Sequence, residues 1–555
     1  MPHKHGWSKI DWNLVNQYID KMQNKIYLAS KSGDYRSMRK LQHLCLKSFR
    51  FRLMATRKVT QDNTGKKTPG IDGLKSLSPK ERLELAKKIR INGKAKKVRR
   101  VEIPKTNGKT RKLGIPTIED RAKQALAKLV LEPEWEAKFS GKSYGFRPGR
   151  SCHDAISDIF INTSTRTEHC HIMDADIKGC FDNINHKFLM DYMNTFPSMR
   201  RQIKAWLESG VQISFNVSLD TYEGTPQGGV ISPLLANIAL DHFDKKMDIL
   251  VENNKGRYIN FSYIRYADDF VLIRKISPAT SGKIRLKDQI EKSVVEALKP
   301  IGLEINKEKT KWTTMSEGFD FLGFNVRTYK TGKYRANKNG TKTLIKPSKK
   351  AIQSHYRKIS EKIGKLKNAP QEGLVKQLNP IIRGWCNYYR GVVSTETFSK
   401  LDHMIHKRIM RMLHSKCQHT GTKEIVKNFF ENDGNRKWKF GNLILHTETK
   451  IVRHVKVQGE RSPYDGDVTY WGQRLAKYSN LTNKKKILLK RQKGLCKICN
   501  RPFLISDMME IDHIQARCNG GSNDLSHLQL VHKHCHETKT PFDLIKRKEA
   551  SQDII

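Results

Sequence analysis

Three carboxylates stand where strand-like runs end, and their spacing suits metal-assisted chemistry. Asp268 and Asp269 lie between the apolar runs 261–264 and 270–273, at the tip of an expected β-hairpin, and Asp176 lies at the end of the run 172–177. Adjacent carboxylates repel and raise each other's pKa, whereas Mg²⁺ favours carboxylates together with substrate phosphates. We therefore expect the three, on neighbouring strands, to hold two Mg²⁺ ions about 3.5–4 Å apart for in-line phosphoryl transfer. A solvated acidic turn is the alternative, and the neighbouring motifs argue against it.

A second group has the spacing of a zinc site. Cys496-x-x-Cys499 and His532-x-x-Cys535 form two pairs near the C-terminal end. Three sulfurs and one imidazole suit a tetrahedral structural Zn²⁺, and a small module with few large apolar residues gains stability from such a metal. Two unrelated thiols on a turn are the alternative. The other cysteines are scattered singly, which excludes a disulfide framework and indicates a reducing compartment.

The charge of the chain points to a polyanionic partner. Lys and Arg number 105 against 55 Asp and Glu, which gives a net charge of +50 at pH 7 over 555 residues. Such a charge opposes compaction and attracts polyanions. The sequence contains no run of about 18 apolar residues, the length needed to span a bilayer. The segment 1–7 lacks the apolar core of a secretory signal. We expect nucleic acid as the partner, no membrane, and an intracellular location: bacterial cytoplasm or nucleoid, or an organelle.

Helices are expected on both sides of a region of mixed helices and strands. An apolar stripe predicts a helix near the N-terminus, with one face formed by Leu14, Ile19, Met22 and Ile26. Residues 61–73 are rich in helix breakers and predict a loop. Within 98–116 the dipeptide Asn107-Gly108 predicts a hairpin, and capping boxes at Thr117 and Ser151 predict helix starts. The mixture continues to about 327, which indicates an α+β region, and the pattern then becomes helical and basic to about 440.

Seven short motifs follow one another along the chain. They are Arg111–Pro116, Tyr144–Ser151, Asp174–Ile184, Gly224–Pro233, Tyr266–Asp269, Gly302–Thr310 and Phe321–Phe324. In this order and spacing they closely resemble the motifs of the reverse transcriptases encoded by mobile group II introns, and the resemblance covers nearly the whole chain. It implies an α+β multidomain fold with a right-hand polymerase of fingers, palm and thumb, and a helical maturase domain.

The resemblance also implies roles in polymerisation. Asp176, Asp268 and Asp269 would be the catalytic metal ligands. The nucleotide-binding candidates are Phe181 as a steric gate against a 2′-OH, Gln227 beside the incoming nucleotide, and Arg111 and Arg121 as triphosphate ligands. Lys309 would neutralise or protonate the pyrophosphate leaving group. Core packing is the alternative for Phe181, and a surface charge is the alternative for the two arginines and for Lys309.

Residues 378–390 resemble the thumb, or maturase domain, of the same family, which grips intron RNA. The RNA-binding candidates are Arg383, Trp385, Tyr388, Tyr389 and Arg390. Rings beside arginines suit base stacking and phosphate contact, and much of the affinity would come from counterion release. The alternative is that the rings form a helical stripe that packs in a core.

The segment between and after the cysteine pairs carries a further set of motifs: Ile511–Ile514, Gly520–Asn523, Leu528–Leu530 and His536. It resembles the HNH (ββα-metal) endonucleases, which intron-encoded reverse transcriptases often carry at this end. By this likeness His513 is the general base that activates water, and Asp512 and His536 hold a catalytic Mg²⁺ or Mn²⁺. Two positions depart from the pattern. His532 replaces a cysteine zinc ligand, and His527 stands at the central Asn, where it would orient the base; Asn523 lies four residues earlier.

Together these likenesses imply RNA-directed DNA polymerase, splicing maturase and site-specific DNA endonuclease activities. The expected partners are group II intron RNA, target DNA and dNTPs; the oligomeric state is left open. A nicked DNA strand would prime cDNA synthesis on the intron template. One alternative is a splicing-only RNA-binding maturase with relic catalytic sites, which the intact aspartates argue against. Another is a host-domesticated reverse transcriptase, which the nuclease module argues against.

Five segments are expected along the chain. They are an N-terminal basic helical extension (1–75), reverse transcriptase fingers and palm (76–335), a thumb or maturase domain (336–445), a DNA-binding linker region (446–487) and an HNH endonuclease domain (488–545). A Lys-rich stretch at 483–486 precedes the last segment, so we expect that segment to be a separate domain behind a linker.

Overall fold

A four-stranded antiparallel sheet lies at the centre of the chain. The computed structural model describes residues 6–104, 108, 110–164, 170–214, 217–219, 224, 228–253, 259–276, 286–330, 341–432, 434, 438–479, 481–505 and 507–552. The central sheet has the order β6-β7-β3-β8, and each neighbouring pair is antiparallel. Its strands are β3 (Cys170–Asp176), β6 (Ile259–Tyr266), β7 (Asp269–Ile276) and β8 (Lys311–Thr314).

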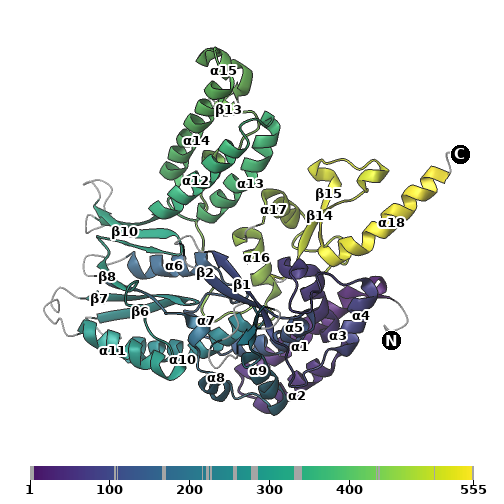
Figure 1. The fold of residues 1–555 in the computed structure, drawn as a ribbon, viewed down its shortest axis with the longest axis vertical. Helices are drawn as coiled ribbons and strands as arrows, with labels where there is room; N and C mark the ends of the chain where they lie inside the picture. Colours follow the sequence, from purple (N-terminus) through teal and green to yellow (C-terminus); the bar gives the residue numbers. More distant parts are fainter. Residues whose placement is uncertain are drawn as a thin grey trace.

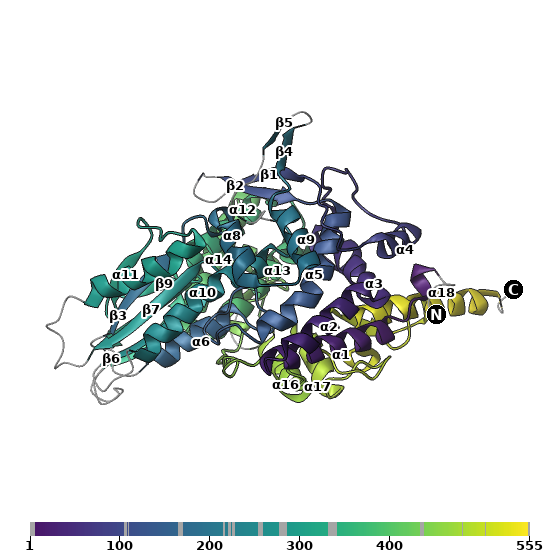
Figure 2. The same cartoon turned by 90° about the horizontal axis from the view of Figure 1, so that it is seen from below.

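Both faces of this sheet are buried, because successive side chains of a strand point to opposite faces. Along β3, Met173 and Ala175 lie in one core, and Cys170 and Ile172 lie in a second. The first face is covered by α5 (Ile118–Glu136), α7 (Cys180–Asn183), α8 (His186–Met193), α9 (Pro197–Leu207), α10 (Ser232–Asn253) and α11 (Leu286–Leu298), which the short helix η5 (Lys299–Ile301) follows. Figure 2 shows α10 and α11 beside the strands. The second face is covered by α6 (Cys152–Thr163), and this mixture confirms the predicted α+β class.

The predicted helix starts are confirmed by their caps. Thr117 precedes α5, and its hydroxyl oxygen accepts a hydrogen bond from the backbone N–H of Asp120 at 3.2 Å. Ser151 precedes α6, and its backbone N–H and hydroxyl both donate to Asp154 Oδ2 at 2.8 and 2.7 Å. These bonds satisfy donors that a helix start leaves unpaired.

A second sheet, of order β2-β1-β4-β5, lies beside α5 and α9. Its strands are β1 (Val98–Pro104), β2 (Thr110–Ile115), β4 (Val211–Ser214) and β5 (Val217–Leu219). The predicted hairpin is confirmed by the antiparallel pairing of β1 with β2, which extends to the partners Pro104 and Thr110. Residue 107 of its turn lies outside the described residues.

Helices of the N-terminal segment pack against α5. They are η1 (Trp7–Lys9), α1 (Trp12–Lys31), α2 (Tyr35–Lys47), α3 (Phe49–Arg57), the π-helical turn η2 (Lys58–Asp62), η3 (Thr64–Lys67) and α4 (Pro79–Lys88). The predicted apolar stripe of α1 is wrong at one end, because Leu14 is 54% exposed and the buried face begins with Trp12 and Val15. The predicted loop 61–73 contains η3.

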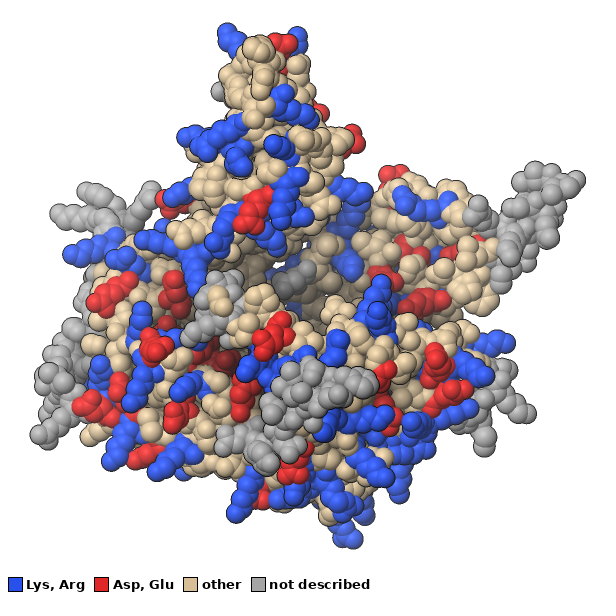
Figure 3. Space-filling model, in the orientation of Figure 1, with Lys and Arg blue, Asp and Glu red and all other residues tan. Residues whose placement is uncertain are grey.

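A helical projection stands above the two sheets (Figure 1). It is connected through the sheet β11-β10-β9, formed by β9 (Phe319–Phe321), β10 (Phe324–Lys330) and β11 (Thr341–Pro347). The projection comprises α12 (Lys349–Lys365), α13 (Gln371–Tyr389), α14 (Thr395–Lys416), α15 (Thr422–Phe429), the hairpin β12 (Phe430–Asn432) and β13 (Trp438–Phe440), and η6 (His446–Glu448). The apolar side chains of the projection continue the second core, and on its surface in Figure 3 the blue Lys and Arg predominate over the red Asp and Glu.

Residues 449–467, which we name the strap, contain neither helix nor strand and return from the projection across α6. Two carboxylates of α6, one helical turn apart, fix the strap. Asp154 Oδ1 accepts from the backbone N–H of Val457 at 2.9 Å and lies 3.1 Å from His454 Nε2. Asp158, which is buried, forms an ion pair with Lys456 of the strap. The strap is therefore a docked segment.

The C-terminal module follows the strap. It contains α16 (Val468–Tyr478), α17 (Asn483–Arg491), β14 (Met509–His513), η7 (Arg517–Asn519), η8 (Leu525–His527), β15 (Leu528–His532) and α18 (Lys533–Gln552). The Lys-rich stretch 483–486 is the first turn of α17, whose Leu488 and Leu489 lie in the core of the module. The stretch is therefore part of the module's helical packing.

The C-terminal module also contacts the N-terminal helices. Arg501 Nη2 lies 2.5 Å from Asp20 Oδ2 of α1, and Arg57 Nη2 of α3 lies 2.8 Å from Glu537 Oε2 of α18. Lys533 Nζ lies 3.1 Å from Asp62 Oδ1. The first and last segments of the chain thus lie side by side, as Figure 2 also shows. None of the helices in the described ranges has the length and apolar character needed to cross a membrane.

Candidate active site and metal centre

The three candidate carboxylates lie at one edge of the central sheet. The register of β3 and β7 sets Asp176 opposite Asp269. Tyr266 of β6 pairs with Asp269 of β7, so Ala267 and Asp268 form a two-residue turn. The backbone N–H of Ile177 donates to the carbonyl of Asp268 at 3.1 Å, which fastens this turn to β3. Local strand pattern therefore places Asp176, Asp268 and Asp269 together, as the sequence predicts.

The carboxylates at this edge perturb one another. Burial raises the pKa of Asp269 to about 7, and the nearby Asp268 and Asp176 add to the rise. Burial also raises the pKa of Asp268. Lys309 Nζ lies 2.6 Å from Asp176 Oδ2, and this hydrogen bond raises the pKa of Lys309. Asn306 Nδ2 donates to the same oxygen at 3.2 Å. The donors offered to a cation here are oxygens, which fits Mg²⁺.

The nucleotide-binding candidates lie in different environments. Phe181, in α7 shortly after β3, is 9% exposed and packs edge-to-face on Phe146 at 6.1 Å between ring centroids. Arg111 lies on β2, and its charge counteracts part of the rise that burial causes in the pKa of Asp268. Gln227 lies outside the described residues.

Arg121 is turned away from solvent. It is 6% exposed, and its guanidinium donates to the carbonyls of Gly65 at 3.2 Å and Thr68 at 2.9 Å. These bonds hold η3 and its C-terminal cap against α5, so a triphosphate contact would require breaking them. The structure thus places Arg121 in the support of the N-terminal segment.

The aromatic RNA-binding candidates of α13 are packed. Trp385 stacks on His355 of α12 with ring centroids 4.5 Å apart and planes 10° apart. The hydroxyls of Tyr388 and Tyr389 donate to the carbonyls of Leu322 at 2.9 Å and Gly323 at 3.1 Å. These rings therefore join the projection to the turn between β9 and β10, which is the alternative that the sequence left open. Of the two arginine candidates, Arg383 is exposed and Arg390 is half-buried.

The predicted zinc ligands converge. One ligand atom from each of Cys496, Cys499, His532 and Cys535 lies within 4.8 Å of the others. In the described part of the chain, this is the only group of three or more His, Cys, Asp or Glu residues that meets that limit. The ligand oxygens of Asp176, Asp268 and Asp269 are therefore spaced more widely than the atoms of this group. His532 Nε2 lies 3.1 Å from Asp507 Oδ2, which leaves Nδ1 for a metal. Sulfur and imidazole donors fit Zn²⁺.

The candidate nuclease residues also come together. Strand β14 carries Asp512 and His513, and α18 carries His536, whose Nε2 lies 3.5 Å from Asp512 Oδ1. Lys539 Nζ lies 2.9 Å from Asp512 Oδ2. Glu510, a residue that the sequence analysis missed, lies 2.7 Å from His536 Nδ1 and so orients Nε2 toward Asp512. The sequence contains a signal for this role, because Glu510 stands two residues before Asp512 and alternate residues of a strand point to the same face.

The partner of the candidate base differs from the expectation. His513 Nε2 lies 3.0 Å from Asn523 Oδ1. The expected orienting residue, His527, contacts Ser526 through its ring, and its carbonyl accepts from the backbone N–H of Ile514. Because a carbonyl oxygen only accepts, His513 Nε2 carries the proton and Nδ1 holds the lone pair that a base needs. Asn523, rather than the expected His527, is therefore the side chain that contacts the candidate base.

Four segments of the chain match models of known protein families. Residues 103–326 match the model of the reverse transcriptase (RNA-dependent DNA polymerase) family, and residues 7–89 match that of the N-terminal domain of reverse transcriptase. Residues 352–430 match the group II intron maturase-specific domain, and residues 496–542 match the HNH endonuclease family.

Individual relatives support the same grouping. Protein YkfC of Escherichia coli is 34% identical over 301 residues, which cover 48% of this chain and 77% of YkfC. The group II intron-encoded protein LtrA of Lactococcus lactis is 28% identical over 418 residues, covering 61% and 68% of the two chains. A putative COX1/OXI3 intron 2 protein of Saccharomyces cerevisiae is 25% identical over 523 residues, covering 79% and 57%. The chain therefore belongs to the group II intron-encoded reverse transcriptases that carry a maturase domain and a C-terminal HNH domain.

Proposed function

We propose that the sheet edge formed by Asp176, Asp268 and Asp269 is the polymerase active site, acting with two Mg²⁺ ions. The main support is the strand register that sets Asp176 opposite Asp269, beside the turn that carries Asp268. The raised pKa of Asp269 reflects burial and mutual repulsion, and a divalent cation relieves that repulsion. Bound ions would lower the pKa of the primer 3′-OH and neutralise the leaving oxygens.

The surrounding residues of the chain align and neutralise the reactants. Asn306 and Lys309 hold one oxygen of Asp176, which fixes the direction of that carboxylate. Lys309 remains a cation and neutralises or protonates the departing pyrophosphate. Arg111 approaches the same edge from β2 and would bind the triphosphate. Following the resemblance, Phe181 acts as the steric gate and Gln227 lies by the incoming nucleotide.

The segments of the chain then take the roles of a right-hand polymerase. The β2-β1-β4-β5 sheet with the N-terminal helices forms the fingers, the central sheet with its helices forms the palm, and α12–α15 form the thumb and maturase domain. Exposed basic residues of the projection, including Arg383, contact phosphates of intron RNA. The packed rings of α13 contribute by holding the thumb on the palm.

In the C-terminal module, His513 acts as general base, oriented by Asn523. Asp512 and His536 would hold one Mg²⁺ or Mn²⁺, with Glu510 orienting His536. Structural Zn²⁺ would be held by Cys496, Cys499, His532 and Cys535. The order of β14, β15 and α18 supports the ββα-metal arrangement.

The protein is a multifunctional intron-encoded reverse transcriptase, maturase and endonuclease. It would bind group II intron RNA, promote splicing, nick one strand of target DNA and extend the new 3′-OH with dNTPs on the intron template. None of the ten cysteines forms a disulfide, which supports a reducing compartment, and we place that compartment in the bacterial cytoplasm or nucleoid, or in an organelle.

Replacement of both turn carboxylates tests the polymerase site. Asp268→Ala with Asp269→Ala should abolish extension of an annealed primer on RNA and leave intron binding and splicing near the wild-type level. A matched control removes two exposed carboxylates elsewhere, Asp191→Ala with Glu208→Ala, and should retain extension. Loss of splicing as large as the loss of DNA synthesis would contradict this separation, and a wild-type protein that splices without extending primers would favour the splicing-only alternative.

A further inference from the structure

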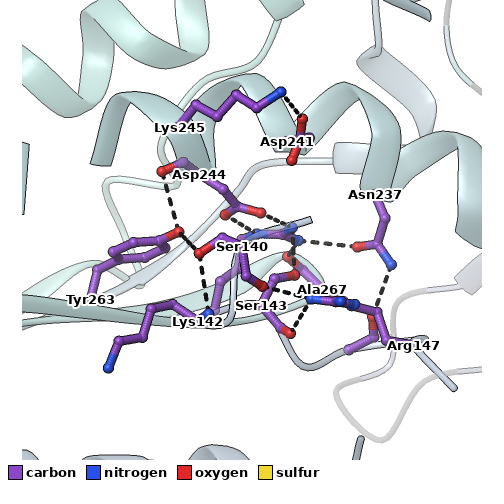
Figure 4. Close-up of polar contacts among 12 residues, drawn as sticks. Ser140, Lys142, Ser143, Arg147, Asn237, Asp241, Asp244, Lys245, Tyr263 and Ala267 are labelled. Carbon is purple, nitrogen blue, oxygen red and sulfur yellow. Dashed lines mark hydrogen bonds and ion pairs between the residues drawn. The ribbon is translucent and has the colours of Figure 1, made fainter. Parts of the chain in front are cut away.

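Arg265, two residues before the Ala267–Asp268 turn, is completely buried. Its side chain has 0% exposure, as does that of Asp244 on α10. The two groups pair through two hydrogen bonds, from Nε to Asp244 Oδ1 at 2.7 Å and from Nη2 to Asp244 Oδ2 at 2.5 Å. This bidentate pair anchors one side of the guanidinium to α10. Figure 4 draws Asp244 and Asn237 on the helix, above Ser143 and Ala267.

The other side of the guanidinium reaches the turn itself. Nη1 donates to the carbonyl of Ala267 at 2.9 Å and to Asn237 Oδ1 at 3.2 Å, and Nη2 donates to Ser143 Oγ at 2.8 Å. All five N–H groups of an arginine are then used. The guanidinium thus connects the Ala267 carbonyl, between β6 and β7, to α10 and to the 140–147 loop.

Ala267 has a backbone conformation that needs such support. Its φ is +58°, the left-handed region that residues with a Cβ adopt rarely and that persists where the surroundings determine it. Gly145 packs on it so closely that a Cβ at Gly145 would lie 2.3 Å from the Ala267 nitrogen. Asn237 Nδ2 holds the Gly145 carbonyl at 2.9 Å, so the same side chain joins Arg265 to this loop. Three elements therefore converge on one residue of the turn.

We propose that Arg265 is a positioning residue for polymerisation: its guanidinium holds the Ala267 carbonyl and thereby fixes the direction of Asp268 and Asp269 relative to Asp176. The inference rests on the proposed polymerase site. Arg265 touches neither substrate nor metal and acts through the backbone of the turn. A planar fork with five donors spans Asp244, Asn237, Ser143 and the Ala267 carbonyl at once, whereas the three donors of a lysine radiate from one nitrogen.

The chain offers a matched control in Arg147. This arginine is 5% exposed and forms the same bidentate pair, from Nε and Nη2 to Glu136 at 2.9 and 3.0 Å. Its remaining hydrogen bonds among the described residues go to the carbonyls of Ser140 and Ser143, not to the 266–269 turn. Arg147→Lys therefore reports the cost of altering a buried pair, and Arg265→Lys reports that cost together with the loss of the turn contact.

The experiment compares wild type, Arg265→Lys and Arg147→Lys by three measurements. Hydrogen–deuterium exchange is read on peptides covering residues 263–270, thermal unfolding gives the midpoint, and single-nucleotide extension gives kcat and KM for dNTP. Arg265→Lys should accelerate exchange at the turn and lower kcat about 100-fold, because small misplacement of reacting groups costs that much. KM should change less than about threefold, since ground-state nucleotide binding is untouched. Arg147→Lys, which reaches the turn only through the 140–147 loop, should shift the midpoint comparably but change exchange at the turn and kcat much less than Arg265→Lys does.

A double variant covers the case in which Arg265→Lys fails to fold. Arg265→Met with Asp244→Leu removes both charges and leaves no lone buried ion, so it should fold and show the same loss of kcat. Unchanged exchange at the turn, or a kcat that falls no further than in Arg147→Lys, overturns the proposal. If the wild-type protein extends no primer, the proposed polymerase site fails, and the exchange measurement still decides whether Arg265 holds the turn.

Discussion

Asn523 Oδ1 lies 3.0 Å from His513 Nε2, although the nuclease pattern places the orienting residue at 527. The loop between β14 and β15 brings Asn523 back over the end of β14, while η8 turns the ring of His527 toward Ser526. A single alanine substitution at each of the two positions shows which residue orients His513.

We predict that Asn523→Ala lowers DNA nicking about 10- to 100-fold, because a histidine base loses its fixed tautomer and direction. His527→Ala should cost less than about threefold, since its backbone carbonyl makes the contact that matters, to Ile514. Nicking of a labelled duplex by the two variants provides the measurement, with primer extension as a control for folding. A loss in His527→Ala that equals or exceeds the loss in Asn523→Ala would contradict the orienting role of Asn523.

Zinc binding and DNA nicking by the C-terminal module should respond differently to two substitutions. Cys496→Ser removes a proposed zinc ligand, and because metal binding supplies folding free energy to such sites, the variant should lose bound zinc and nicking together. His513→Ala should lose nicking and keep zinc. Zinc content, nicking and primer extension on both proteins check this. A His513→Ala protein that nicks at the wild-type rate would indicate a DNA-binding zinc fold without nuclease activity.

The helical projection should lose stability in mild acid. Burial, with a smaller contribution from His446, lowers the pKa of His355 to about 3 from 6.5. The unfolded chain therefore binds a proton between pH 6.5 and 3 that the folded chain does not, so stability is full above pH 6.5 and falls as the pH falls. At pH 5 this amounts to about 2 kcal/mol. His355→Gln should flatten the pH dependence of the urea midpoint between pH 7 and 5; an unchanged slope would contradict a neutral buried His355.

Binding of intron RNA should weaken steeply with salt. At a net charge of +50, log K should fall per log unit of salt by roughly 0.7–0.9 times the number of phosphates contacted. Arg383→Ala should lower that slope by about one contact, while Tyr388→Phe, which alters only a packed ring's hydroxyl, should leave it unchanged. Filter binding between 50 and 500 mM KCl measures both, and a nearly flat titration would exclude a phosphate-dominated interface.

Local patterns predicted the hairpins, the helix starts and the position of the three carboxylates at the strand ends, because each pattern lies within one strand pair or one helix start. The hairpin around Asp268 and the caps at Thr117 and Ser151 need no information from distant residues. The sequence does not predict those contacts that residues far away in the chain supply. Arg121 is occupied by carbonyls 53 and 56 residues away, and the hydroxyl of Tyr388 by one 66 residues away.

Arg265 illustrates the same limit within the site itself. Its position before the aspartates is visible in the sequence, but its buried partner Asp244 lies on a helix 21 residues upstream. No periodicity pairs a strand residue with one particular residue of a covering helix. Such a role becomes visible only when burial and hydrogen-bond partners are known.

The docking of the C-terminal module on the N-terminal helices has a consequence for biosynthesis. Arg501 and Asp20 are 481 residues apart, so at about 5–20 residues per second the ribosome delivers the second partner roughly 25–100 s after the first. During that interval the polymerase and maturase segments emerge complete while the nuclease is still being made. Nascent protein is thereby able to engage its intron RNA before it can cut DNA, and a translation arrest late in the reading frame would yield a splicing factor without a nuclease.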